Sequence, residues 1–240
     1  MNISIIVPAF NESKKIGRDI KAAEEFIVRN NFQGEIFVVD DGSKDDTAEA
    51  AKTVEISPHI SLRVIRYEPH RGKGYAVRTG MKSAKGDYIL FADSGLCVPY
   101  DYVLTGLKIL KSGDFDIAHG SRKLEDSKII RQQPWLRRLI SKVFRWIFIH
   151  WLHVPSELTD TQCGFKVYKG DAARKLYEQC VTDGFLFEIE IIVRAQKQGY
   201  RIKEFPVEWT VDLDSRLSLT RNSFGFIREL IAVKRLLSNM

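Results

Sequence analysis

Four short segments of this chain combine the groups that could bind a nucleotide diphosphate. In chain order they are Pro8-Ala9-Phe10-Asn11-Glu12, Asp40-Asp41-Gly42-Ser43, Arg71-Gly72-Lys73-Gly74 and Asp93-Ser94-Gly95. Their carboxylates can accept hydrogen bonds from base N–H groups or ribose hydroxyls, their cations can neutralise phosphate, and their glycines let backbone approach a ligand. Each segment alone is also typical of an ordinary turn. The four together, in this order, indicate a nucleotide site.

Each of these segments follows an apolar run that predicts a strand. The expected strands cover residues 2–7, 35–40, 61–66 and 88–92, and the expected helices between them cover 14–28, 45–53 and 75–84. Strands alternating with helices predict a mostly parallel sheet with helices on both faces. Ligands of such sheets bind beyond the carboxyl ends of the strands. We therefore expect all four segments to line one cleft.

The remaining chain continues this pattern and then departs from it. A helix over 99–111 and a strand over 115–120 are expected next, and residues 134–153 predict one long helix. After that we expect a strand at 166–168, a helix from Gly170, a helix over 185–198, an edge strand over 201–209 that contains Pro206, and a final helix over 224–237. With no linker or repeat, the 240 residues predict one α/β domain.

Composition and missing motifs exclude several classes of protein. No run approaches the roughly 18 apolar residues of a membrane span, and no signal-peptide pattern precedes the first strand, so we expect a cytoplasmic protein. Cys97, Cys163 and Cys180 form no CxxC pair, which argues against zinc and disulfides. The chain has no Walker lysine motif, no GxGxxG after the first strand, no HExxH and no GxSxG.

The positive charge of the chain is concentrated in one segment. Residues 122–145 hold eight basic and two acidic side chains, which equals the net charge of +6 for the whole chain. On a helical wheel of residues 134–153, three tryptophans and other apolar side chains fill one half and four cations the other. This pattern is typical of a helix at a membrane surface, although a core-packed helix with a solvated basic face is the alternative. Cations alternating with apolar groups at helical spacing disfavour nucleic acid as the partner.

The chain resembles a known family through seven segments. They are VPAFNE, VVDDGSKDDT, HRGKGYAVRTGM, GDYILFADS, HGSRK, TDTQCGFKVY and EFPVEW, in this order. The series is similar to inverting family 2 glycosyltransferases of GT-A fold, and most similar to polyprenyl-phosphate sugar transferases, especially dolichyl-phosphate β-glucosyltransferases. The resemblance extends from Ile3 to about Leu230. It implies transfer of a sugar from a nucleotide donor to the phosphate of a polyprenyl or dolichyl carrier, peripherally on the cytoplasmic face of a membrane.

The resemblance also implies roles for particular residues. UDP-glucose is the favoured donor, held by residues 1–122, and the acceptor is held by residues 123–240 with the helix 134–153 on the membrane. The implied donor site comprises Pro8, Phe10, Glu12, Asp40, Asp41, Arg71, Lys73, Asp93 and Ser94. Asp93, Asp160 and Gln162 are the implied catalytic residues, and Arg122, Arg131 and Arg216 the implied acceptor-phosphate ligands. Asp160 would orient or deprotonate the acceptor, with a loop cap as the structural alternative.

One position departs from the family. Its Asp-x-Asp motif normally supplies a second, metal-binding carboxylate, but here that position is Gly95 and the next usual polar position is Cys97. Asp93 remains as the expected ligand of Mg²⁺ or Mn²⁺, with Ser94 as a weak neutral one. Hard cations prefer several oxygen ligands, so we expect a poorer metal site that forms with the donor. A GDP-mannose or other donor with a different acceptor, or a catalytically silent nucleotide-sugar binder, are the alternatives.

Overall fold

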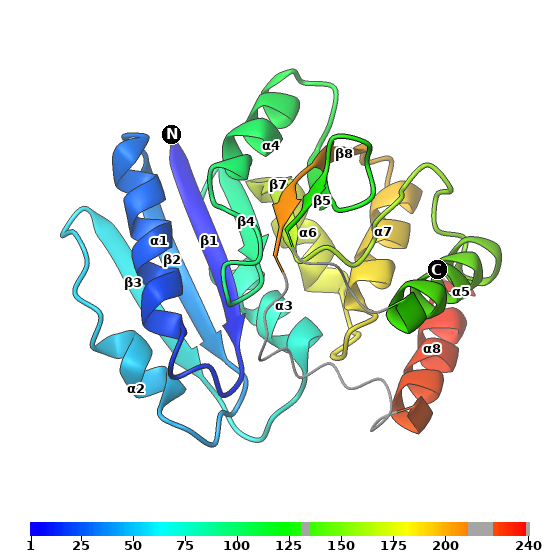
Figure 1. The fold of residues 1–240 in the computed structure, drawn as a ribbon, viewed down its shortest axis with the longest axis horizontal. Coiled ribbons are helices and arrows are strands. Elements are labelled where there is room, and N and C mark those ends of the chain that lie inside the picture. The colour runs from blue at the N-terminus through cyan, green and yellow to red at the C-terminus, as the bar shows by residue number, and fades with distance from the viewer. Residues whose placement is uncertain (131–134, 211–222, 239–240) are drawn as a thin grey trace.

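The computed structural model describes residues 1–130, 135–210 and 223–238 and shows a seven-stranded sheet covered by helices on both faces (Figure 1). Its order is β3-β2-β1-β4-β7-β5-β8, and β7 runs antiparallel to β4 and β5 while the other pairs are parallel. The strands are β1 Asn2–Ala9, β2 Gln33–Asp40, β3 Ile60–Arg66, β4 Tyr88–Ala92, β5 Ile117–Ser121, β7 Phe165–Lys169 and β8 Ile202–Pro206. The predicted α/β fold with a mostly parallel sheet is therefore confirmed.

Eight helices occupy the described residues. They are α1 Ile16–Arg29, α2 Thr47–Lys52, α3 Lys73–Ser83, α4 Tyr102–Lys111, α5 Trp135–Leu152, α6 Gly170–Gln179, α7 Phe187–Lys197 and α8 Ser223–Ser238. No described helix is long and apolar enough to cross a membrane.

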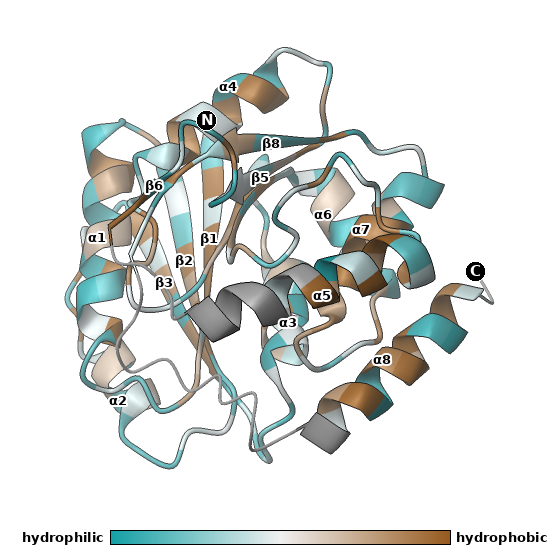
Figure 2. Ribbon diagram, turned by 45° about the vertical axis from the view of Figure 1, so that its right-hand side comes forward, coloured by the Kyte–Doolittle hydropathy of each residue, from teal (hydrophilic) through white to brown (hydrophobic). Residues whose placement is uncertain are grey.

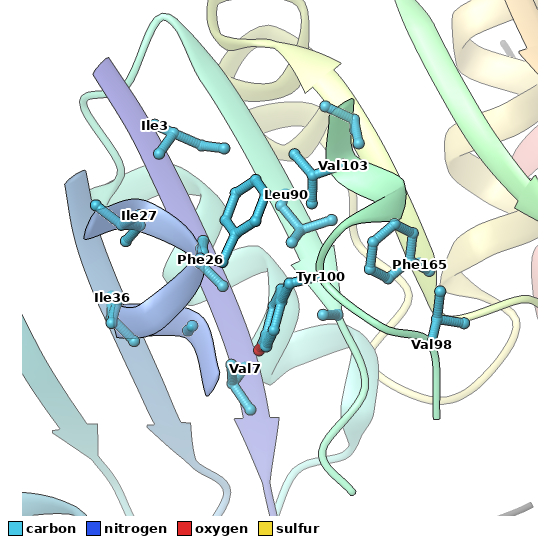
Figure 3. Packing of buried hydrophobic residues seen from close by; sticks show 14 of the residues in the cluster. Ile3, Val7, Phe26, Ile27, Ile36, Leu90, Val98, Tyr100, Val103 and Phe165 are labelled. Carbon is cyan, nitrogen blue, oxygen red and sulfur yellow. The ribbon is translucent and has the colours of Figure 1, made fainter. Parts of the chain in front are cut away.

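The alternation of side chains along β1 explains why both faces of the sheet are covered. Ile3, Ile5 and Val7 point to one face, where they join α1 and α4 in a core that contains Phe26, Leu90 and Tyr100 (Figure 3). Ile6 points to the other face and packs with α3, α6 and α7. Successive side chains of a strand point to opposite faces, so a strand that is buried on both sides must be apolar throughout.

A third core lies beside the sheet, among α5, α7 and α8. Phe148 and Leu152 of α5 are at most 5% exposed and pack with Ile189 of α7 and Leu230 and Val233 of α8. In Figure 2, brown hydrophobic segments run along α8 and the coloured part of α5. The predicted helix over 134–153 therefore exists, and part of its apolar half faces the protein.

Two of the predicted boundaries are wrong in ways that affect the site. α3 begins at Lys73, two residues before the predicted start, because Gly72 with φ 123° ends the preceding loop as its N-cap. The predicted strand 201–209 divides at Pro206, which donates no backbone hydrogen bond: β8 ends there, and β9 Glu208–Trp209 pairs instead with β6 Lys128–Ile129, a strand that the sequence did not predict. Lys73 is thus held by a helix and not by a loop.

Candidate active site

The polar groups predicted from the sequence lie along one edge of the sheet. The carboxyl ends of β1, β2 and β4 reach this edge, which is at the bottom of the sheet in Figure 1. β5 ends there as well, and the antiparallel β7 begins there. Strand direction alone therefore places the segments after Ala9, Asp40, Ala92 and Ser121 beside the loop before Phe165.

Asp41 fixes the loop that precedes α3. Its buried carboxylate accepts hydrogen bonds from the backbone N–H groups of Arg71 and Gly72, both at 2.8 Å. The Nδ1 atom of His70 lies 2.8 Å from the same carboxylate, and its ring stacks on Phe10 with centroids 4.2 Å apart. Asp41 therefore holds the ends of β1 and β2 against the loop before α3.

Asp40, Glu12 and Pro8 lie in the segments 8–12 and 40–43, at the ends of β1 and β2. The Asp40 carboxylate accepts a hydrogen bond from the Ser43 N–H at 2.9 Å, and its Oδ2 atom lies 3.8 Å from Arg66 Nε with no hydrogen-bond partner among the described residues. Glu12 pairs with Lys15 at 2.8 Å, and its own N–H donates to Thr47 Oγ1 at 2.7 Å. Pro8 lies opposite Val39 in the pairing of β1 with β2. Asp40 thus keeps a buried oxygen that a ligand could use.

Arg71 is exposed at the rim of this group. Its guanidinium lies 2.9 Å from Asp183 and stacks over the Tyr75 ring at 3.7 Å. Arg78 donates to the same Asp183 carboxylate at 2.5 Å. A phosphate would therefore meet a cation that is already oriented by an aromatic ring and a carboxylate.

Asp93 begins a chain of alternating charges that leads into the protein. Its Oδ1 atom lies 2.8 Å from Lys73 Nζ, which lies 3.3 Å from Glu188, and the other oxygen of Glu188 binds Lys166. Burial alone would lower the pKa of Lys73, but the Asp93 and Glu188 carboxylates raise it above its usual range. Lys73 is therefore a permanent cation at the end of β4.

The loop before β7 touches Asp93 directly. The Asp93 N–H donates to the Gly164 carbonyl at 2.8 Å, and a Cβ atom on Gly164 would collide with the Asp93 carboxylate. Any larger residue at position 164 would therefore displace the Asp93 carboxylate from its present place. The contact joins the donor-side carboxylate to the segment that contains Asp160 and Gln162.

The turn after Asp93 is held by a residue that the sequence analysis missed. Ser94 is half-buried, and Gly95 has φ 96° and donates its N–H to the Asp19 carboxylate of α1 at 2.6 Å. Asp19 is 1% exposed, and burial raises its pKa to about 6 against the opposing effect of the Gly95 N–H. The glycine that replaces the family carboxylate therefore occupies a backbone conformation that L side chains rarely adopt.

Arg122 and Asp160 form a closed pair at the end of β5. The Nε and Nη2 atoms of Arg122 donate to the two Asp160 oxygens at 2.6 and 2.7 Å, and the Arg122 N–H adds a third bond at 3.0 Å. Burial would raise the pKa of Asp160, but the Arg122 guanidinium lowers it to about 2. Asp160 is therefore a weak base in this arrangement, and Arg122 is oriented by it.

The loop that contains Asp160 has its own supports. Glu204 of β8 accepts hydrogen bonds from the Thr159 and Asp160 N–H groups at 2.8 and 2.7 Å. Gln162 is half-buried, and its Nε2 atom is buried without a hydrogen-bond partner among the described residues. An unpaired buried amide costs free energy unless a ligand completes it. Gln162 is thus the group of this loop most suited to a sugar hydroxyl.

Two predicted residues cannot be placed, because Arg131 and Arg216 lie outside the described residues. Within the described part of the chain, no three His, Cys, Asp or Glu residues gather in a way that could hold a metal ion. Asp93 is the one carboxylate at the position of the Asp-x-Asp motif, and Lys73 already contacts one of its oxygens. The protein groups alone therefore do not fit a divalent cation, which prefers several oxygen ligands.

Some of the missed residues left a signal in the sequence. Asp19 lies at the spacing of the buried residues Ile16, Ile20 and Ala23 of α1, where an acidic residue is unusual. Glu188 likewise lies in the apolar run Phe185–Val193, yet it is 3% exposed. Charged residues on the apolar face of a predicted helix could therefore have been identified as candidates, although their partners could not.

Comparison with known proteins agrees with this arrangement. The family model described as Glycosyl transferase family 2 matches residues 4–177. The dolichyl-phosphate β-glucosyltransferase of Dictyostelium discoideum is 30% identical over 242 residues, covering 97% of this chain and 73% of the relative. The human dolichyl-phosphate β-glucosyltransferase is 31% identical over 226 residues, covering 90% and 69%.

A solved structure shares the fold. Glucosyl-3-phosphoglycerate synthase from Mycobacterium tuberculosis, in complex with Mn²⁺ and UDP-glucose, superposes with a TM-score of 0.71 over 97% of this chain and 78% of that chain at 18% identity. The resemblance found from the sequence motifs is confirmed by the family model and by these relatives. The chain belongs to glycosyltransferase family 2 and is a glycosyltransferase of GT-A fold.

Proposed function

We propose that this protein transfers glucose from UDP-glucose to the phosphate of a polyprenyl or dolichyl carrier, with inversion at the sugar carbon. The observation that carries the proposal is the contact between Asp93 and Gly164, which brings the nucleotide-side carboxylate to the loop of Asp160 and Gln162. The named activity of relatives about 30% identical over nearly the whole chain supports the choice of sugar and acceptor.

The acceptor side needs orientation more than deprotonation. The second pKa of a phosphate monoester is about 6, so the acceptor is largely dianionic near neutral pH. Asp160, with its pKa of about 2, is a poor base but a strong partner for Arg122. We assign Asp160 to the orientation of Arg122, Arg122 to the acceptor phosphate, and the unpaired Gln162 amide to a sugar hydroxyl. Arg131 and Arg216 remain proposed phosphate ligands.

The donor side supplies hydrogen-bond acceptors and positive charge. The Oδ2 atom of Asp40, which has no hydrogen-bond partner among the described residues, could accept from a base or ribose group, and Phe10 with Pro8 and Glu12 lines the same sheet edge. Arg71 and Lys73 lie near the expected diphosphate, where cations stabilise the charge that develops on the leaving nucleotide. Asp41 holds the loop that carries Arg71, and Ser94 remains a proposed ligand of the donor.

The direct test is transfer of radiolabelled glucose from UDP-glucose to polyprenyl phosphate, with lipid-linked glucose as the product measured. We expect Gln162→Ala to lower kcat about 100-fold, whereas Gln196→Ala, an exposed glutamine of α7, should leave it unchanged. UDP binding without transfer from UDP-glucose, GDP-mannose or other common donors would contradict the proposal and favour a nucleotide-sugar binding protein.

We further propose that the protein works at the cytoplasmic face of a membrane, held there through α5 and α8. Val143 and Trp146 of α5 are 52% and 62% exposed, and Ile227 of α8 is 52% exposed. Phe144 of α5 contacts Phe226 of α8 with centroids 4.7 Å apart, so the two helices form one unit. Exposed apolar side chains beside a basic segment suit a lipid surface.

Vesicle flotation can test this surface. The double variant Val143→Ser, Trp146→Ser should bind anionic vesicles about tenfold more weakly, since it removes apolar area that the bilayer would bury. Val28→Ser is the matched control, because Val28 of α1 is 53% exposed and lies on a different helix. Equal vesicle binding by all three proteins would exclude α5 as the contact.

A further inference from the structure

The charge chain at the end of β4 differs from a metal site in its balance of charges. Asp93 and Glu188 supply two negative charges, and Lys73 and Lys166 supply two positive ones. Lys73 is 18% exposed and contacts both carboxylates, at 2.8 and 3.3 Å. The formal charges therefore cancel without any added ion.

A divalent cation at Asp93 would disturb this balance. It would have to displace the Lys73 ammonium or lie beside it, and two cations sharing one carboxylate repel each other strongly at such distances. The protein also supplies few ligands for the cation, since Gly95 contributes no carboxylate and the described residues contain no cluster of three ligands. The positive charge of Lys73 therefore opposes metal binding to the free protein. The free protein also supplies too few oxygen ligands for a divalent cation.

The geometry points to Lys73 as the resident counter-ion of Asp93, which competes with divalent metal so that the ion enters only together with a nucleotide diphosphate. The diphosphate brings the negative charge and the oxygen ligands that the protein lacks. Lys73 is also the first residue of α3, and a helix N-terminus attracts anions such as the phosphates of the nucleotide. The inference relies on the proposed function for the nucleotide diphosphate alone.

The fold holds Lys73 in place from two sides. The backbone of the 70–72 loop is bound by Asp41, and the Tyr75 N–H donates to the Asp183 carbonyl at 3.1 Å. The Lys73 ammonium lies 5.0 Å from the centre of the Phe91 ring on β4, which favours a cation at this point. Lys73 is thus a positioned charge and not a mobile surface lysine.

Binding of Mn²⁺ followed by electron paramagnetic resonance tests the competition, because the signal of free aqueous Mn²⁺ is lost on binding. Wild-type protein without nucleotide should leave millimolar Mn²⁺ largely free, and adding UDP should induce binding. Lys73→Met should bind Mn²⁺ without UDP at least about tenfold more tightly than wild type, since it frees the Asp93 carboxylate. Lys82→Met, an exposed lysine of the last turn of α3, should match wild type.

A double variant distinguishes this site from others. Adding Asp93→Asn to Lys73→Met should abolish the gained Mn²⁺ binding. The inference is overturned if wild-type protein without UDP binds Mn²⁺ as tightly as Lys73→Met, or if the gain survives in the double variant. Lys73→Gln provides the same comparison if Lys73→Met does not fold. Because no sugar transfer is measured, failure of the proposed reaction would leave this outcome unaffected.

Discussion

Asp93 and Asp160 both bind a cation at the same sheet edge, but their environments are opposite. Asp160 is 1% exposed, and Arg122 binds both of its oxygens in a bidentate pair. Asp93 has a side chain 35% exposed, and Lys73 contacts its Oδ1 atom. One carboxylate is built into the fold, whereas the other can exchange its partner for a ligand.

The difference separates a carboxylate that supports the fold of this protein from one that faces its candidate site. A buried bidentate pair cannot be opened without leaving a charge in the interior, so it suits a fixed support. A half-buried pair exchanges with water and ions at little cost. Substitution at Asp160 should therefore damage the protein, and substitution at Asp93 should damage the reaction.

The largest expected effect is that of Asp160→Ala on stability. It leaves the Arg122 guanidinium buried without its partner, so the free energy of unfolding should fall by about 3–5 kcal/mol in chemical denaturation. Asp114→Ala is the control, because Asp114 is 68% exposed and lies 4.0 Å from Arg201, and it should change stability by less than about 0.5 kcal/mol. If Asp160→Ala lost as little stability as Asp114→Ala, the proposed distinction between Asp160 and Asp93 would be wrong.

Asp93→Asn should show the reverse pattern. Lys73 keeps Glu188 as a partner, so the free energy of unfolding should change by less than about 1 kcal/mol. Transfer of glucose should nevertheless fall about 100- to 1,000-fold, since the group facing the donor loses its charge. A full-rate Asp93→Asn enzyme would show that this carboxylate is not part of the chemistry.

Asp19 extends the comparison to a buried carboxylate that accepts a hydrogen bond from Gly95 and whose nearest cation is Arg18, an exposed side chain 3.6 Å away. Its pKa of about 6 in the folded protein exceeds the ordinary 3.8, so the folded state retains the proton longer than the unfolded state. Stability from this group is complete below about pH 4 and is lost as the pH rises through about 6. Asp19→Asn does not titrate, so it should gain about 3 kcal/mol relative to wild type between those pH values.

Denaturation curves recorded across this pH range measure the effect. Asp114→Asn serves as the exposed control and should follow wild type at every pH. Parallel stability profiles for wild type and Asp19→Asn would mean that Asp19 stays ionised in the fold.

The smallest expected effect concerns Gly95, whose φ of 96° disfavours any side chain. Gly95→Ala should cost about 1–2 kcal/mol of stability in thermal or chemical unfolding. Gly113→Ala is a matched variant, because Gly113 has φ 85° and a Cβ atom there would meet nothing within 4 Å. Both should lose similar stability, but only Gly95→Ala should weaken UDP binding. Equal UDP affinity in the two variants would separate this turn from the donor site.

Much of the fold could be predicted because it depends on local pattern. Apolar runs such as Ile3–Val7 predict buried strands, and their alternation with amphipathic helices predicts a parallel sheet. Strand direction then brings Asp40 and Asp93 to one edge without knowledge of any side-chain contact. The antiparallel insertion of β7 and the pairing of β6 with β9 were not predictable in this way, since each joins segments far apart in the chain.

The sequence by itself determined which residue types meet at this edge and the absence of a second carboxylate at Gly95. The tertiary structure decided their partners: Lys73 meets Glu188 across 115 positions, and Arg122 meets Asp160 across 38. It also divided the apolar half of α5, burying Phe148 and leaving Trp146 exposed. Local sequence sets backbone conformation and the face of each side chain, but the pairing of charges depends on distances that only the packed chain creates.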